Sequence, residues 1–388
     1  MVTLRSGVVM AVVLVAVSLV AGASGLDWSS VPVVRHAEYQ AVNPDGATAY
    51  PGGGFPIRLI GVVLNNTEDW LDPTPAYDPV VHLWAMGGQA EFYVQALTVS
   101  TLDALGVEYY NPDDFGGTAC WMGQNYGNHI MHQDPMFNYT DAEWTAELGR
   151  LDLLGGDDVT DPIRAGDLVE VRVRGGLHYS GKMNVNERHS NDPANDFEVV
   201  RLTTGFGLPA ATPLTLADLK TADDTALFDP SRQTGGERHQ STLVEIRGVW
   251  VTDAVAWTTD TTLTVTDGVR TFEVYLALNP SFDGTILFGP GEPFSVVGIM
   301  DQAASHGVYS TDGYRLLVMN AADVRAVRPG DADGDGDVDL DDFVILKQNF
   351  GAAPLADGRA DFDFDGDIDL DDFVILKQSF GTAPASGR

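Results

Sequence analysis

The chain has 388 residues but a single cysteine, Cys120, and little positive charge. One cysteine cannot form an intrachain disulfide, so the chain is not a disulfide-stabilised scaffold. No motif pairs Cys120 with a base, and we interpret it as a small buried apolar residue. Lysine and arginine number 22 against 56 acidic residues, which gives a formal net charge of −34. Nucleic acids and anionic lipids are bound through lysine and arginine, so we expect neither nucleic acid nor a membrane surface as a partner.

Motifs of common enzyme classes are also missing. The sequence contains no G-x-S-x-G nucleophile motif, no P-loop and no Rossmann glycine pattern. Acidic pairs at 113–114 and 157–158 and the His-x-x-His-x-Asp run at 129–134 carry residue types that could act in catalysis or bind a metal. Loop acids are common in so acidic a chain, so we predict no catalytic site. Several aromatic residues could instead form a sugar-stacking platform, although core packing explains them equally well: Trp70, Trp84, Trp121, Trp144, Tyr109 and Tyr110.

Only one long apolar run is present, and it lies at the N-terminus. Arg5 precedes apolar residues 8–20, and Ala21-Gly22-Ala23 has the small residues of a cleavage site. A membrane-spanning helix needs about 20 apolar residues, more than this run provides. We therefore expect residues 1–23 to be a signal peptide cleaved near Ala23, and the mature protein to be secreted and extracellular.

The middle of the chain has the alternating pattern of β-strands. Residues 57–64, 90–97 and 167–174 alternate apolar and polar side chains, and a long Gly- and Asn-rich insertion occupies 111–156. Strands resume after residue 241, with a hairpin signal at Asp267-Gly268. Composition predicts a first β-rich domain over 24–204, a Pro- and Asp-rich linker over 205–240, and a second β-rich domain over 241–328.

Both β-regions repeat one order of elements. A long strand containing glycine is followed by a hairpin, an excursion and two further strands, which is the order of an OB-type barrel. We therefore expect a multidomain, mainly β protein with two OB-like β-barrel domains. The alternative is a β-sandwich.

The most specific pattern begins at Asp331 and is repeated from Asp361. Each copy is a twelve-residue run of alternating aspartates, followed by Phe-Val-Ile-Leu-Lys-Gln. A calcium loop takes oxygen ligands from positions 1, 3, 5, 7, 9 and 12 and has glycine at position 6. Position 7 provides a backbone carbonyl and position 9 acts through a water. The sequence thus predicts two calcium ions, held by Asp331, Asp333, Asp335, Asp337, Asp339 and Asp342 and by Asp361, Asp363, Asp365, Asp367, Asp369 and Asp372.

The apolar residues at position 8, Val338 and Ile368, suit a short strand that pairs the two loops. Pro329-Gly330 before the first loop and residues 357–360 before the second leave no room for an entering helix. Each calcium loop should therefore be followed, but not preceded, by a helix.

This repeat resembles the type I dockerin module, the calcium-dependent docking domain known from bacterial cellulosomes. In that family the loop ends in Asp and a single helix follows with a basic residue near its middle, as Asp342, Asp372, Lys347 and Lys377 do here. The resemblance implies a small α-helical module over 329–388 that binds a cohesin-like domain.

Partner recognition in the family involves loop positions 10 and 11, which are often small hydroxyl residues. Here they are leucine and aspartate, which leaves docking intact but the identity of the partner open. The four consecutive apolar residues of each helix point all round it, so we expect surplus apolar surface beside the lysines. The alternative places the whole apolar run in an intramolecular core. The predicted partner-binding residues are Leu340, Asp341, Ile345, Lys347, Leu370, Asp371, Ile375 and Lys377.

These observations predict an exported calcium-binding protein that docks to a cohesin-like partner, with β-domains for binding or scaffolding. The alternative is a polysaccharide-degrading enzyme of glycoside hydrolase type, or its carbohydrate-binding accessory, in an extracellular complex. This alternative rests on the family resemblance, because dockerins are usually attached to such proteins. Extracellular polysaccharide is then a candidate second partner.

Overall fold

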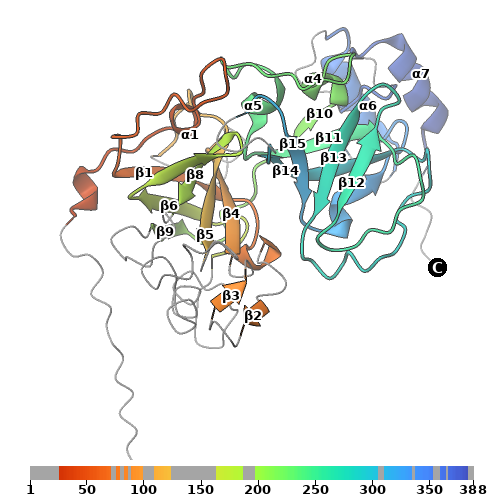
Figure 1. Ribbon diagram of the computed structural model, residues 1–388. Coiled ribbons are helices and arrows are strands. Elements are labelled where there is room, and N and C mark those ends of the chain that lie inside the picture. The colour runs from red at the N-terminus through yellow and green to blue at the C-terminus, as the bar shows by residue number, and fades with distance from the viewer. Residues whose placement is uncertain are drawn as a thin grey trace, which may run out of the picture.

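The computed structural model describes residues 26–70, 76–78, 83–85, 89–98, 109–123, 163–186, 197–304, 310–333, 337–352, 359–363 and 366–382. The described chain is mainly β, with two large sheets, a two-stranded hairpin, a few short helices and a small helical module at its C-terminal end (Figure 1). The expected signal peptide and the runs at 129–134 and 157–158 lie outside the described residues. No helix in the described ranges is long and apolar enough to cross a membrane.

The first sheet joins seven strands in the order β7-β8-β5-β4-β1-β6-β9. Its inner face buries one apolar cluster that includes Leu59, Phe92 and Val171, and Cys120 is fully buried there as predicted. Short elements surround the sheet: η1 (Trp28–Ser30), α1 (His36–Tyr39), η2 (Thr67–Trp70) and the hairpin of β2 (Ala76–Asp78) and β3 (Leu83–Ala85). The strands are β1 (Ile57–Val63), β4 (Gln89–Gln95), β5 (Gly117–Gly123), β6 (Leu168–Val173), β7 (Gly176–Tyr179), β8 (Lys182–Asn186) and β9 (Glu198–Thr203).

The second sheet has the order β10-β11-β14-β15-β13-β12, with β16 paired to β14. The hairpin predicted at Asp267-Gly268 is confirmed, because β12 and β13 pair antiparallel on either side of it. Its own apolar cluster includes Ile246, Val274 and Leu316. The elements are β10 (Thr212–Leu214), α4 (Leu216–Leu219), α5 (Gly235–His239), β11 (Leu243–Val249), β12 (Thr262–Thr266), β13 (Thr271–Leu276), β14 (Phe294–Gln302), β15 (Tyr314–Val318), η4 (Ala321–Asp323) and β16 (Val324–Ala326).

Closed OB-like barrels are not confirmed. Each sheet does contain a parallel pair among its antiparallel strands, β5–β8 in the first sheet and β13–β15 in the second, and the second sheet also contains the parallel pair β10–β11. Among the described residues, however, neither sheet closes by a continuous ladder. In the second sheet the edge strand β12 meets the chain directly after β11 through the bridge of Trp250 and Thr266, whose backbone hydrogen bonds are 3.0 and 2.9 Å long. Each sheet packs its own main apolar cluster, and a smaller cluster joins the two sheets where they meet.

The composition of residues 205–240 predicts a linker, but the structure places ordered elements there. β10 pairs in parallel with β11, and Leu214, Leu216 and Leu219 are buried in the second core. Proline and aspartate mark the turns between these elements, while three leucines supply enough apolar surface to anchor them. The middle of the segment therefore packs with the second sheet, whereas Phe206 at its start is buried against the first.

The two β-domains meet over a buried interface. Tyr93 of the first sheet lies in one apolar cluster with Ile299 and Leu317 of the second. Trp70 stacks on Tyr275 with ring centroids 5.3 Å apart, so its ring packs between the domains rather than forming an open sugar platform.

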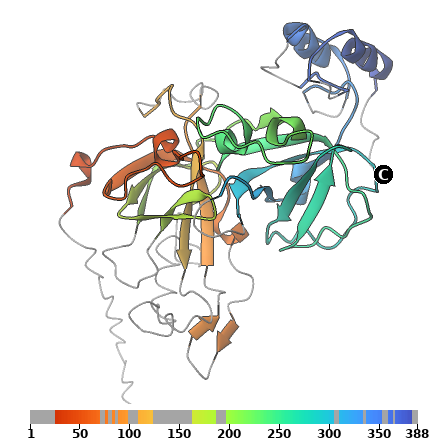
Figure 2. The same cartoon turned by 45° about the horizontal axis from the view of Figure 1, so that its top comes forward.

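The C-terminal module contains α6 (Leu340–Asn349) and α7 (Leu370–Ser379), which lie beyond the second sheet (Figure 2). It has a separate small core of Ala332, Val338, Leu346, Ala360, Phe362, Ile368 and Leu376. As expected, the chain enters each calcium loop without a preceding helix in the described residues.

Candidate metal centre and docking surface

Aspartates set the start of both module helices. Asp339 is the N-cap of α6, where its side chain accepts a hydrogen bond from the amide of Asp341 at 2.8 Å. Asp342, three residues on, accepts from the Asp339 amide at 2.7 Å and completes a capping box. Asp369 and Asp372 repeat this arrangement in α7, at 2.8 Å. The final residue of each loop is thus fixed by the helix that follows it.

The position-12 carboxylates are also buried. Asp342 is 1% exposed, and its Oδ1 accepts from the amides of Ala332 at 2.6 Å and Asp333 at 3.1 Å. Asp372 is 1% exposed and accepts from the Phe362 amide at 2.6 Å. No lysine or arginine of the described residues forms an ion pair with either carboxylate. Buried carboxylates without a basic partner favour a bound cation, and a metal ion fits this site.

The other loop aspartates gather around these two. Carboxylate oxygens of Asp331 and Asp333 lie within 4.8 Å of each other and of Asp342, and those of Asp361 and Asp363 do the same around Asp372. Four further residues form equivalent groups with the same two carboxylates: Asp337, Asp339, Asp367 and Asp369. Ligand sets made only of oxygen suit a hard cation such as calcium. The predicted ligands Asp335 and Asp365 lie outside the described residues.

Each loop–helix repeat of the module contacts the C-terminal end of the other repeat. The expectation that Val338 and Ile368 pair with each other is wrong. Val338 instead exchanges backbone hydrogen bonds with Gly381 and Thr382, at 2.7 and 2.9 Å, and the Ile368 carbonyl accepts from Gly351 at 2.7 Å. Each loop is therefore hydrogen-bonded to the residues that follow the other helix. A structural change in one loop should affect both loop–helix repeats.

The outer faces of the helices carry apolar residues at matching positions. Leu340 and Leu370 are 67% and 63% exposed, and Val344 and Val374 are 44% and 40% exposed. Of the other predicted partner-binding residues, four are exposed beside them: Asp341, Lys347, Asp371 and Lys377.

Two predicted partner-binding residues lie elsewhere. Ile345 and Ile375 are half-buried and pack against the module core, so they do not belong to the exposed face. Four consecutive apolar residues, Phe-Val-Ile-Leu, do not indicate which of them face the core. The i, i+4 spacing from Leu340 to Val344 would have identified the valine as an outer residue.

Comparison with protein families decides how this module is classified. Residues 329–381 match the dockerin type I domain. We call this part of the chain the dockerin module. Dockerin type I domains bind calcium, in agreement with the aspartate clusters, and they dock to cohesin domains in extracellular assemblies.

Comparisons of the whole chain add little. No curated protein matches it. Two solved chains of the single-stranded DNA binding protein from Thermus aquaticus are similar. The wild type is 14% identical, covers 70% of this chain and 92% of that chain, and has a TM-score of 0.16. A deletion mutant is 12% identical, with coverages of 70% and 94% and a TM-score of 0.15. TM-scores this low carry no argument about the β-domains.

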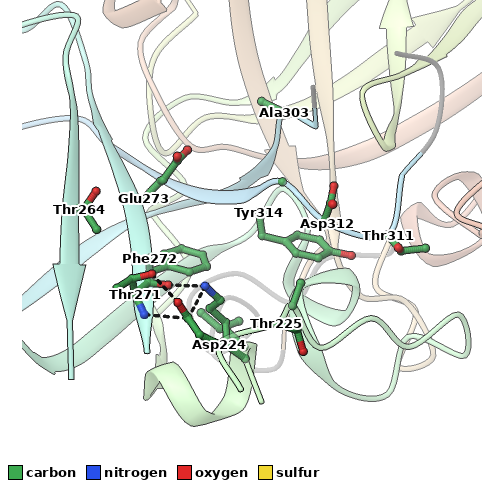
Figure 3. A pocket seen from close by; sticks show the side chains of 14 residues that line it. Asp224, Thr225, Thr264, Thr271, Phe272, Glu273, Ala303, Thr311, Asp312 and Tyr314 are labelled. Carbon is green, nitrogen blue, oxygen red and sulfur yellow. Dashed lines mark hydrogen bonds and ion pairs between the residues drawn. The ribbon is translucent and has the colours of Figure 1, made fainter. Parts of the chain in front are cut away.

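A groove of about 730 Å³ lies beside β12 and β13 (Figure 3). Its acid Asp224 accepts hydrogen bonds from the Thr271 amide and hydroxyl, at 2.9 and 2.8 Å, and pairs with Lys220 at 2.5 Å. The hydrogen bond from Lys220, with those from Thr271, lowers the pKa of Asp224 to about 2. Asp224 is therefore an ionised structural acid and cannot serve as a proton donor near neutral pH.

Proposed function

We propose that this chain is an extracellular protein whose β-domains are carried into a multi-protein assembly by the dockerin module. The match of residues 329–381 supports docking to a cohesin partner. The single observation that carries the proposal is the repeated exposed face on α6 and α7, because such a face has no partner within the described module.

In this proposal calcium organises the docking surface. Each ion is held by the loop carboxylates assigned from the sequence, with Asp342 and Asp372 as the central ligands. The same two carboxylates complete the capping boxes of α6 and α7, so an ion bound to them would help to hold the start of each helix. The cation supplies positive charge that allows these carboxylates to lie close together.

The docking surface consists of Leu340, Val344 and Lys347 on α6 and their equivalents Leu370, Val374 and Lys377 on α7. Spacings of three and four residues place each set on one side of its helix. Because the two sets are identical in sequence, either helix can lead in the complex.

Charge substitution tests this surface. We expect Val344→Asp alone and Val374→Asp alone to bind a cohesin domain nearly as well as wild type, and the double variant to lose at least about 100-fold, because a buried unpaired charge is costly. Titration calorimetry in calcium measures the affinity. Val269→Asp, at a 61% exposed valine in the β12–β13 hairpin, is the matched control. Loss of binding in one single variant would contradict the two orientations, and full binding by the double variant would place the docking surface elsewhere.

A second role concerns extracellular polysaccharide. The groove beside β12 and β13 is lined by hydroxyl and acidic side chains, among them Thr264, Thr311 and Glu273, which suit the hydroxyl groups of a sugar chain. Asp224 is unsuited to proton transfer, and Glu273 and Asp312 are the other acids among the described residues of the groove, so we expect binding and test for hydrolysis separately. A polysaccharide pull-down run beside a reducing-end assay separates the two possibilities, and release of new reducing ends would establish an enzyme.

A further inference from the structure

A cavity of about 280 Å³ lies where the two β-domains meet, and residues at the end of α5 form part of its wall. Ligand sites favour such domain boundaries, and this volume is at the small end of their range. It accommodates a molecule of about one sugar ring. The first domain contributes Gln95, Tyr110 and Phe115 to its wall, and the second contributes Arg238, His239 and Thr242.

Arg238 is an unusual feature of this wall. Its guanidinium lies 4.0 Å from the centroid of the Phe115 ring and is half-buried. Within the described part of the chain it forms no ion pair and donates no hydrogen bond, although the protein carries a net charge of −34. Burial lowers the pKa of Arg238, but an arginine remains charged at neutral pH. A partly desolvated guanidinium without an acidic partner favours an anion bound beside it.

The neighbouring arginine shows the contrast. Arg232 also contacts Phe115, at 5.0 Å, but it donates hydrogen bonds to the carbonyls of Glu237 at 3.0 Å and Ala37 at 3.1 Å. Its guanidinium also lies 3.9 Å from the Glu237 carboxylate. The acid nearest to the pair is therefore associated with Arg232 and leaves Arg238 uncompensated.

Besides Arg238 and the Tyr110 phenol, two titratable groups of the described chain line the cavity. Oδ1 of Asp114 accepts hydrogen bonds from the amides of Ala37 and Phe115, at 3.0 and 2.9 Å, and no oxygen of Asp114 lies within ion-pair distance of Arg238. Burial, with the nearby charge of Arg238, lowers the pKa of His239 to about 4, so this imidazole is neutral at pH 7. Among the described residues, Arg238 is thus the one cationic side chain that lines the cavity, and Asp114 lies in the same wall, so one carboxylate matches the site better than a doubly charged phosphate.

We propose that this cavity binds the carboxylate of a compact hydroxylated ring, of the kind found in a hexuronic acid. The planar guanidinium of Arg238 presents paired N–H donors to the two carboxylate oxygens. Tyr110 and Phe115 supply apolar contact for the ring, and the Gln95 amide and the Thr242 hydroxyl are the polar groups beside it. The site is independent of the dockerin module.

The test uses the full chain in calcium and sodium glucuronate as the probe, with glucose and inorganic phosphate for comparison. We expect saturable binding of glucuronate by titration calorimetry or ligand-observed NMR, and weaker binding of both comparison compounds. Arg238→Gln should lose roughly tenfold or more in affinity, as removal of a charge-assisted hydrogen-bond pair implies. Arg325→Gln is the control, because Arg325 is an exposed arginine on β16, beside the end of β14 remote from the cavity.

Three results would overturn the assignment. They are the absence of saturable glucuronate binding by wild type, equal binding by Arg238→Gln, and phosphate binding tighter than glucuronate. Circular dichroism of both variants checks that they are folded. The comparison of the three compounds on the wild-type chain decides the question even if Arg238→Gln does not fold.

Discussion

Asp301 is the buried charge that joins the two β-domains. Its side chain is fully buried, and one oxygen accepts a hydrogen bond from Arg315 at 2.9 Å. The other oxygen contacts Lys182 and accepts from the Tyr93 hydroxyl at 3.1 Å. Although burial raises its pKa, Lys182 and Arg315 bring the pKa of Asp301 below its ordinary value. Lys182 and Tyr93 belong to the first sheet, so Asp301→Asn removes an anion shared across the interface.

The expected cost follows from what the substitution leaves behind. Removing one partner of a buried ion pair costs about 3–5 kcal/mol, because the other charge stays buried and unpaired. Lys182 retains Glu91 at 3.2 Å, and that carboxylate is 20% exposed, so we expect the lower end, about 3 kcal/mol. The control is Glu245→Gln, which breaks the partly exposed pair with Arg247 and changes net charge equally. Partly exposed ion pairs of this kind contribute about 0–1 kcal/mol to the free energy of unfolding.

Urea unfolding of the full chain in calcium, followed by tryptophan fluorescence, measures the difference. Trp70 stacks on Tyr275 at the interface and reports directly on its integrity. Adding Lys182→Met to Asp301→Asn should restore part of the lost stability, since the stranded ammonium group is removed. A difference below about 1 kcal/mol between Asp301→Asn and Glu245→Gln would refute the assignment of interface stability to this network.

The calcium loops and the buried acid Glu237 provide further tests. Chelation should abolish the far-UV signal of α6 and α7 in the full chain but leave the β signal, because unscreened loop carboxylates repel each other; an unchanged spectrum would contradict this. Asp342→Asn with Asp372→Asn should weaken both calcium sites by more than about tenfold in titration calorimetry, whereas the exposed control pair Asp341→Asn and Asp371→Asn should not. Burial raises the pKa of Glu237 from 4.5 to about 7, so the folded state holds its proton more tightly and stability falls by roughly 3 kcal/mol as pH rises through that window. Glu237→Gln should lose this dependence in thermal unfolding between pH 5 and 8, and identical slopes in both proteins would show that Glu237 is not its source.

Short-range patterns predicted the dockerin module well. Oxygen ligands at fixed spacing determine where the loop turns and where the helix starts, so Asp331, Asp342 and their repeats could be placed from the sequence alone. The outer face of each helix was only partly predictable. Leu340 and Lys347 are exposed, but Ile345 is turned inward because a run of four apolar residues does not reveal which one meets the core.

Long-range contacts were not predictable. Lys182 and Asp301 are far apart in sequence, and neither lies in a motif, yet they form a buried ion pair across the domain boundary. Arg238 was missed for the same reason, since its lack of an acidic partner becomes evident only after folding. Residues 205–240 resembled a linker because turn-forming residues dominate their composition, while the burial of Leu216 depends on a sheet assembled from later strands.

The two parts of the molecule depend on different forces, and this difference has a functional consequence. The β-domains are held by large apolar clusters and a buried ionic network, none of which requires a metal ion. The dockerin module has a small core and buried carboxylates that need a cation. Val338 and Ile368 each form backbone hydrogen bonds with the other loop–helix repeat, so loss of one ion should destabilise both helices. We therefore expect calcium concentration to control docking while the β-domains stay folded.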